Sequence, residues 1–150
     1  MYIVRPMRKT KMTLLCVLLG LFQGMVLPSC ETNRGELIPY LEFDIYLLLY
    51  ADLADLGIGG TKLIDGGVNG IVIYRESDLE FHAYDRTCTM WPEHDAAVTE
   101  DPTFFGVFEC PVCGSTYLLM NGGEPNSGPA RYPLVEYSTS LNGDVLRIFN

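Results

Sequence analysis

Residues 110–115 read CPVCGS and residues 84–94 read YDRTCTMWPEH, and these two segments guide the interpretation of the whole chain. In the first segment two cysteines stand in C-x-x-C spacing, which lets both thiols reach one metal ion. Gly114 follows the second cysteine and allows backbone amides to point at sulfur, which stabilises a thiolate. The second segment adds Cys88 and His94. Three thiols and one imidazole are therefore expected in two loops, each of which leaves a predicted strand.

The residues around these loops alternate between apolar and polar types, which is typical of half-buried β-strands. Three hairpins are predicted: residues 70–75 with 79–85, 104–110 with 116–120, and 135–140 with 144–149, the last with Asn142-Gly143 at its tip. Residues 40–50 also alternate, with a helix over 46–56 as the competing interpretation, and the Gly- and Pro-rich residues 121–133 are predicted to form a loop. Many short strands without a long helical stretch indicate an all-β sandwich or small barrel.

Four short motifs follow one another in the second half of the chain: Cys88-Thr89-Met90, CPVCGS, Gly128-Pro129-Ala130 and Pro133-Leu134. With this order, residues 71–150 resemble a Rieske domain, whose members carry C-x-H, then C-P-x-H-G-S, then G-P-A and P-L. The chain is also similar to a group of exported Rieske-like lipoproteins with altered cluster loops. The resemblance implies an all-β, Rieske-like small sandwich or barrel of antiparallel strands with two opposed cluster-type loops.

The ligand positions of this motif are altered. A Rieske [2Fe–2S] cluster has two cysteines on one iron and two histidines on the other. By motif position Cys88 and Cys110 match the cysteines, whereas Met90 and Cys113 stand at the histidine positions. Three outcomes are open: the three thiolates and His94 hold a two-iron cluster, the same four residues hold a tetrahedral zinc ion, or Cys88 pairs with Cys110 or Cys113 in a disulfide and no metal is bound.

Other residues of the two loops have roles that the resemblance implies. Ser115 matches the family serine that hydrogen-bonds cluster sulfur, and Tyr117 matches an aromatic position beside the centre. Met90 is a weak neutral ligand for ferric iron and is expected beside the centre rather than on it. Glu93 and Val112 stand where many family members have a second pair of cysteines, so that disulfide is absent.

The N-terminal segment predicts export. Its four basic residues precede Met12, and the apolar run over residues 12–27 is shorter than the roughly 20 residues that a membrane-spanning helix needs. Residues 27–30, LPSC, resemble a bacterial lipobox, which implies cleavage before Cys30 and lipidation of that cysteine. We therefore expect a lipoprotein in the cell envelope, anchored to the membrane at Cys30, with a signal peptide over residues 1–29, a lipidated tether over 30–36 and a domain over 37–150.

The charge of the chain restricts its partners. Ten Lys and Arg stand against 19 Asp and Glu; residues 1–29 hold four of the basic residues and no acidic one, so six remain against 19 and the net charge becomes −13. Such an acidic domain is not expected to bind nucleic acid, and the sequence has no hydrolase or phosphate-loop motif. We expect an electron-transfer module with a redox or envelope protein as partner rather than a stand-alone enzyme. The alternative is a metal-free binding or structural lipoprotein of the same fold.

Overall fold

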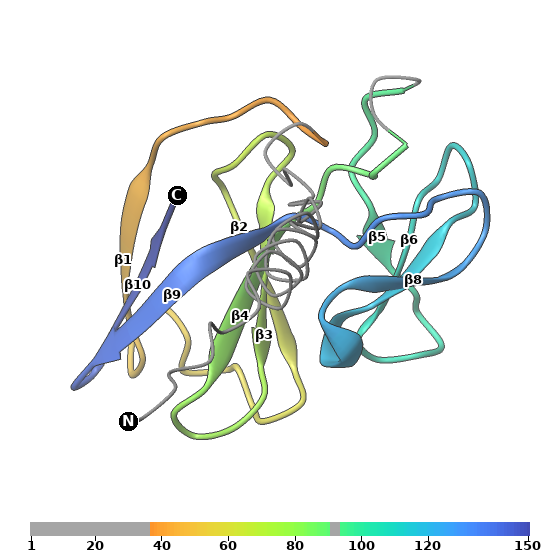
Figure 1. Cartoon of the computed structure of the whole chain (residues 1–150). Coiled ribbons are helices and arrows are strands. Elements are labelled where there is room, and N and C mark those ends of the chain that lie inside the picture. Colours follow the sequence, from red (N-terminus) through yellow and green to blue (C-terminus); the bar gives the residue numbers. More distant parts are fainter. Residues whose placement is uncertain (1–36, 91–93) are drawn as a thin grey trace, which may run out of the picture. The chain divides into compact units, whose positions relative to one another are not determined.

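A computed structural model describes residues 37–90 and 94–150 of the chain, which form two antiparallel sheets (Figure 1). The six-stranded sheet has the order β1-β10-β9-β4-β3-β2, with β1 Asp44–Leu48, β2 Thr61–Ile64, β3 Ile71–Arg75, β4 Phe81–Asp85, β9 Glu136–Asn142 and β10 Val145–Phe149. The four-stranded sheet has the order β5-β6-β7-β8, with β5 Thr99–Glu100, β6 Val107–Glu109, β7 Thr116–Leu118 and β8 Glu124–Ser127. The predicted all-β class is confirmed.

Helical structure in the described residues is limited to a single 3-10 turn, η3, over Leu119–Asn121. Within residues 37–90 and 94–150 we find no helix with the length and apolar character needed to cross a membrane.

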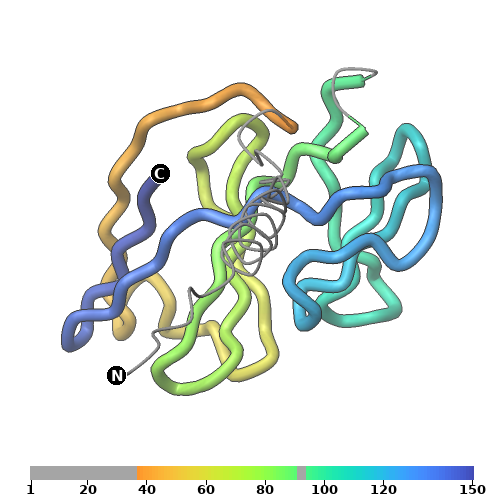
Figure 2. The backbone as a smooth tube through the Cα atoms, in the orientation of Figure 1, coloured from red at the N-terminus to blue at the C-terminus, as the bar shows by residue number. Residues whose placement is uncertain are grey.

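The small sheet is an insertion into the large one. The chain leaves the large sheet at the end of β4, builds β5 to β8, and returns as β9, which pairs with β4 through Ala83 and Tyr137 (Figure 2). Both cysteine-containing loops lie in this insertion, between β4 and β5 and between β6 and β7. The large sheet therefore serves as the frame on which the small sheet and its two loops are mounted.

Strand β3 separates two hydrophobic cores, which explains its uninterrupted apolar sequence. Its alternate side chains point to opposite faces: Ile71 and Ile73 belong to the core of the large sheet, whereas Val72 and Tyr74 pack into the core of the small sheet. All four are buried. A strand that is covered on both faces needs apolar residues at every position rather than at alternate ones.

The core of the small sheet lies directly under the two loops. Phe108 of β6, Tyr117 of β7 and Leu119 are fully or almost fully buried, and they form one cluster with Cys88 and Cys110. Burial of side chains of this size stabilises a fold by about 1.5–3 kcal/mol each. The two cysteines are thus held in place by the same packing that stabilises the domain.

Several local predictions need correction. Residues 121–133 are not a continuous loop, because Glu124–Ser127 form β8 and pair with β7. Gly122 and Gly123 have φ of 71° and 69°, a conformation that favours glycine, and they turn the chain back beside β7. Strands β2 and β5 were not predicted, since each is short and carries little alternation of its own.

Two further corrections concern the edges of the large sheet. The expected strand over residues 40–50 is confirmed only for Asp44–Leu48, and the competing helix over 46–56 is wrong. The last hairpin is tipped by Gly143 and Asp144, because Asn142 already pairs with Val145. Gly143 has φ of 59°, so the glycine signal was located correctly and the register of the turn was off by one residue.

Candidate metal centre

The first loop is anchored at the end of β4. The buried carboxylate of Asp85 accepts hydrogen bonds from the backbone N–H groups of Val68 (2.6 Å) and Thr87 (2.7 Å) and from the hydroxyl of Tyr137 (2.6 Å). Three residues after Asp85, the backbone N–H of Cys88 donates to the carbonyl of Ala96 at 2.9 Å. These bonds fix the backbone on both sides of Cys88, whose side chain is fully buried.

The second loop is a tight turn between β6 and β7. The backbone N–H of Cys110 donates to the carbonyl of Ser115 at 2.8 Å, and the N–H of Gly114 donates to the carbonyl of Cys110 at 2.9 Å. Gly114 has φ of 68°, which closes the turn at little steric cost. The loop buries Cys110 completely and leaves Cys113 half-buried between the exposed residues Val112 and Gly114.

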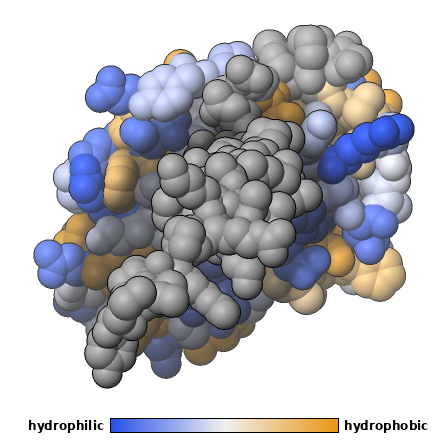
Figure 3. Space-filling view, in the orientation of Figure 1, coloured by the Kyte–Doolittle hydropathy of each residue, from blue (hydrophilic) through white to orange (hydrophobic). Residues whose placement is uncertain are grey.

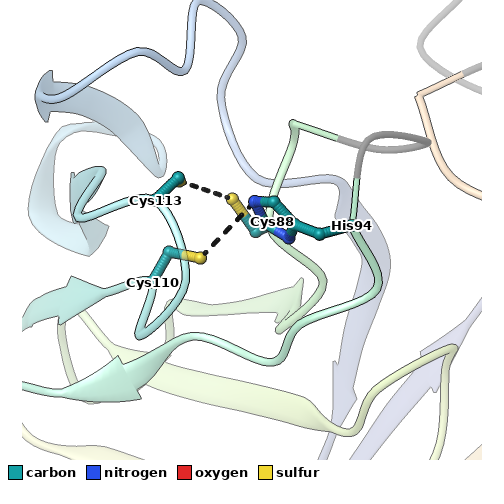
Figure 4. A group of neighbouring side chains, drawn as sticks. All are labelled: Cys88, His94, Cys110 and Cys113. Carbon is teal, nitrogen blue, oxygen red and sulfur yellow. Dashed lines mark hydrogen bonds between the residues drawn. The ribbon is translucent and has the colours of Figure 1, made fainter.

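The two loops bring four donor atoms together. The side chains of Cys88, His94, Cys110 and Cys113 point toward one another, and their ligand atoms all lie within 4.8 Å of each other (Figure 4). The Sγ atoms of Cys88 and Cys113 are 3.6 Å apart, and Sγ of Cys110 is 3.8 Å from Nε2 of His94. The sequence named these four residues as the candidate ligands, and the structure places them side by side.

His94 has few other partners in the described part of the chain. Its Nδ1 atom is buried without a hydrogen-bond partner, and its other contacts are to cysteine sulfurs, with Nε2 lying 3.8 Å from the Cys110 thiol. A buried polar group without a partner destabilises the fold, and a metal-ligating histidine uses one ring nitrogen for the ion. A metal ion among the three sulfurs would give this imidazole the strong interaction that the protein alone does not provide.

The thiols are free and differ in acidity. Burial raises the pKa of Cys88 to about 12. Burial also acts on Cys113, but hydrogen bonds from the hydroxyl and backbone N–H of Ser115, together with contacts to His94 and Cys110, outweigh it and lower its pKa to about 6. The Cys113 thiolate is therefore favoured at neutral pH, and a cation is needed before the Cys88 thiol loses its proton.

Hydroxyl groups surround the sulfurs. The Ser115 Oγ lies 3.1 Å from Sγ of Cys113 and accepts a hydrogen bond from the Ala130 N–H at 3.0 Å. The Tyr117 hydroxyl lies 3.3 Å from Sγ of Cys88. Burial raises the pKa of Tyr117, which keeps its proton available for sulfur. The family resemblance expected a hydrogen-bond donor to sulfur at Ser115 and an aromatic side chain beside the centre at Tyr117.

The other residues that the sequence analysis singled out do not belong to the cluster of four donors. Met90 is half-buried and packs against the hydrophobic core beneath the loops. Glu93 and Cys30 lie outside the described residues, as do the predicted signal peptide and tether. Val112 is exposed at the tip of the second loop, with 63% of its surface accessible.

Sequence reasoning missed two residues that support the site. Thr89 donates its hydroxyl to the Tyr132 carbonyl (2.7 Å) and its backbone N–H to the Tyr117 hydroxyl (3.1 Å). Gly128 packs so closely on Ser115 that an added Cβ would lie 2.8 Å from both the backbone nitrogen and Oγ of that serine. The G-P-A motif contains this glycine, but no local pattern identifies its partner across the sheet.

The other histidine, His82, lies on the large sheet in a surface cluster with Glu76 and Glu136. Nε2 of His82 contacts a carboxylate oxygen of Glu76, and Nδ1 contacts one of Glu136, both at 2.7 Å. Burial lowers the pKa of His82, but the two carboxylates outweigh it and raise the pKa above its ordinary value. This histidine is an ion-pair residue of the frame.

Comparison with known proteins identifies the fold. No protein-family model and no curated protein matches the sequence. Among solved structures, the ferredoxin of carbazole 1,9a-dioxygenase from Nocardioides aromaticivorans IC177 is 16% identical, with a TM-score of 0.46 over 73% of this chain and 97% of that chain. The cyanobacterial plasma membrane Rieske protein PetC3 from Synechocystis PCC 6803 is 20% identical, with a TM-score of 0.52 over 69% of this chain and 97% of that chain. The latter likeness, together with the two-sheet topology, shows that this chain has a Rieske-like fold.

The donor set fits iron or zinc, but its spacing does not fit the two-iron cluster of the Rieske family. Thiolate and imidazole are ligands that both ions accept. In a two-iron cluster, ligands on different irons are separated by more than the edge of one coordination tetrahedron, because the two irons lie between them. The four donor atoms here all lie within 4.8 Å of one another, as around a single ion.

Proposed function

We propose that this domain binds iron through Cys88, Cys110, Cys113 and His94 and acts as an electron-transfer module. The observation that carries the proposal is the convergence of three thiols and one imidazole at the two loops of a Rieske-like fold. Iron held there would supply one-electron transfer, because thiolate ligands support both its ferrous and its ferric state. The roles of this chain's residues are to hold that ion, to exclude water from it and to tune its charge.

Burial and hydrogen bonding support this role. Cys88 and Cys110 are fully buried, and the Tyr117 and Ser115 hydroxyls lie next to two of the three sulfurs. Hydrogen bonds to sulfur reduce the charge on the ligands, and with solvent exposure they set the potential of such a centre. Cys113 is half-buried at the outer loop, so a redox partner protein is expected to approach there.

We propose in addition that the domain is held at a membrane of the cell envelope. The support comes from the sequence: a basic N-terminus, an apolar run over residues 12–27, and LPSC at residues 27–30. A diacylated Cys30 would give stable membrane binding, because two acyl chains suffice where one is marginal. Residues 31–36 would then connect the lipid to the folded domain.

Structural zinc is the second candidate for the site. It is favoured by the ligand set itself, since three cysteines and one histidine around a tetrahedral ion form a common structural zinc site. The metal-free alternative with a disulfide is not favoured. The three cysteines are free, and the Sγ atoms of Cys88 and Cys113 are 3.6 Å apart, compared with about 2.05 Å in a disulfide.

The test is metal analysis of the full-length protein, exported with its own N-terminal segment and extracted from the membrane in mild detergent. We expect bound iron, a visible absorption that bleaches on reduction, and a reversible one-electron potential. Cys113→Ser should lose the iron, whereas Val112→Ala, a change at an exposed neighbour in the same loop, should retain it. A protein that contains zinc, or no metal with all colour absent, would exclude electron transfer. Mass spectrometry of the same sample tests lipidation of Cys30.

A further inference from the structure

We infer that the site is built for one four-coordinate metal ion held by Cys88, Cys110, Cys113 and His94, and not for a two-iron cluster. The inference rests on the proposed metal binding but concerns a different property, the number of ions. The shared chemistry is a single divalent iron or zinc ion with three thiolate ligands and one imidazole.

The distances agree with a single tetrahedron. With metal–sulfur bonds of about 2.3 Å and a metal–nitrogen bond of about 2.0–2.1 Å, the tetrahedral edges are about 3.8 Å between sulfurs and about 3.5 Å between sulfur and nitrogen. The Cys88–Cys113 sulfur pair is 3.6 Å apart and the Cys110–His94 pair is 3.8 Å apart. In the whole set no pair of donor atoms is separated by more than 4.8 Å.

The pairing of the donors also argues against two irons. Motif positions would place Cys88 and Cys110 on one iron, with Cys113 on the other. The structure brings Cys88 into contact with Cys113 as well as with Cys110, and Cys110 into contact with His94 (Figure 4). The donors therefore form one group, and the Cys88–Cys113 contact joins two sulfurs that the motif positions would assign to different irons.

Packing around the loops resists the widening that a cluster requires. The Sγ of Cys88 lies against the Tyr117 hydroxyl, and Ser115 is pressed between Cys113 and Gly128. The Cα of Ser115 is so close to Gly128 that even one methyl group would not fit between the two segments. Outward movement of the second loop would therefore require rearrangement of residues 128–130 as well.

The net charge of the site and the number of its ligands also favour a single ion. Three thiolates and a neutral imidazole around a divalent ion give a net charge of −1, which two nearby hydroxyl donors can stabilise in a buried site. The fourth ligand is His94, whose ring has no other strong partner among the described residues. One ion therefore satisfies every donor of the group and leaves no coordination position open.

Stoichiometry of the full-length, detergent-extracted protein tests this inference. We expect one iron or zinc ion per chain by native mass spectrometry, with no acid-labile sulfide. After metal removal, one equivalent of Co²⁺ should restore the site and give the visible bands of a tetrahedral thiolate complex. His94→Cys, which keeps four ligands, should still bind one Co²⁺. His94→Ala should bind it more than tenfold more weakly, since loss of even an outer hydrogen-bond partner costs about 10–100-fold, and Val112→Ala should bind as the wild type does.

Each outcome separates this inference from the proposed function. Two irons and two sulfides per chain would overturn the single-ion inference and leave electron transfer intact. One iron without sulfide supports both. One zinc ion supports the single-ion inference and overturns electron transfer. A protein without metal that also fails to bind Co²⁺ overturns both.

Discussion

The hydroxyl of Ser115 is predicted to set the acidity of Cys113. It lies 3.1 Å from the sulfur and is itself fully buried, with its oxygen fixed by the N–H of Ala130 at 3.0 Å. A hydrogen bond to a charged group contributes about 1.5–3 kcal/mol, and one pKa unit corresponds to about 1.36 kcal/mol. Ser115→Ala should therefore raise the pKa of Cys113 from about 6 by about 1–2 units.

The assay is alkylation of the metal-free protein with iodoacetamide between pH 5 and pH 10, with the modified cysteine identified by peptide mass spectrometry. The midpoint of the pH–rate profile is the quantity to compare, because a thiolate of lower pKa is also less nucleophilic and the rates alone partly cancel. Cys88 and Cys110 are fully buried and should react slowly. Ser127→Ala is the matched control, since that hydroxyl bonds Thr116 on the neighbouring strand.

The same substitution has a consequence for stability. A thiol whose pKa is lowered by folding stabilises the native state above its unfolded pKa of about 8.5, and that contribution is lost as the pH falls through the folded pKa near 6. The metal-free wild type should thus gain more stability than Ser115→Ala between pH 6 and pH 9. An unchanged alkylation midpoint in Ser115→Ala would refute the argument that this hydroxyl controls the sulfur.

Three further changes test the packing and the frame. Tyr117→Phe should lower the free energy of unfolding by about 1–3 kcal/mol in urea titration, because buried hydrogen bonds lose their partner; an unchanged midpoint would contradict it. His82→Gln should lower the free energy of unfolding by about 0.2–1 kcal/mol at pH 5.5 and leave it unchanged at pH 9. The pKa of this histidine is raised in the folded protein, so its ion pairs stabilise the fold below pH 6.5 and are lost as the pH rises through the raised pKa. Gly128→Ala should lower the free energy of unfolding by more than about 2 kcal/mol and weaken metal binding. Gly143 also has a positive φ but lies in open space, so Gly143→Ala should lower the free energy of unfolding by only about 1–2 kcal/mol and leave the metal bound.

The four donors could be predicted from the sequence because cysteine and histidine are typical metal ligands. Cysteine and histidine are rare in this chain, and C-x-x-C spacing restricts where two thiols can meet. The supporting residues Thr89 and Gly128 belong to no such motif of metal ligands. Thr89 reaches Tyr132 across a separation of 43 residues, and Gly128 leaves no room for a side chain because Ser115 lies against it. Contacts of this kind depend on the tertiary fold, which local patterns do not encode.

The strands likewise divide into those that the local sequence predicts and those that depend on tertiary contacts. Strand β3 and strand β4 were predicted well because their long apolar or alternating runs are fixed by the two cores that they separate. Strand β8 was missed because its sequence, EPNS, has turn-forming composition. It becomes a strand only through pairing with β7, which two glycines at positive φ make possible. Neighbouring backbone, rather than residue preference, decides its conformation.

The described residues on the face drawn in Figure 3 form no single apolar docking patch. Hydrophilic and hydrophobic residues are interspersed over the described part of the face drawn in Figure 3. Exposed aromatic residues do occur on the small sheet, at Phe104 and Phe105 in the turn before β6. A partner that exchanges electrons must nevertheless come close to the sulfurs, and among the three cysteines only Cys113 is not fully buried.

A change of ligands can leave the surroundings of the centre unchanged, because hydroxyl donors serve any thiolate. Ser115 and Tyr117 act on sulfur atoms, and each would withdraw charge equally from a cluster ligand or from a ligand of a single ion. What must change is the fourth donor. With Met90 in the core and Cys113 supplying sulfur, the remaining position needs an imidazole from elsewhere, and His94 reaches it from further along the first loop. On the single-ion proposal, the fold and its hydroxyl groups remain those of a Rieske-like domain, while the donor atoms serve one metal ion instead of a cluster.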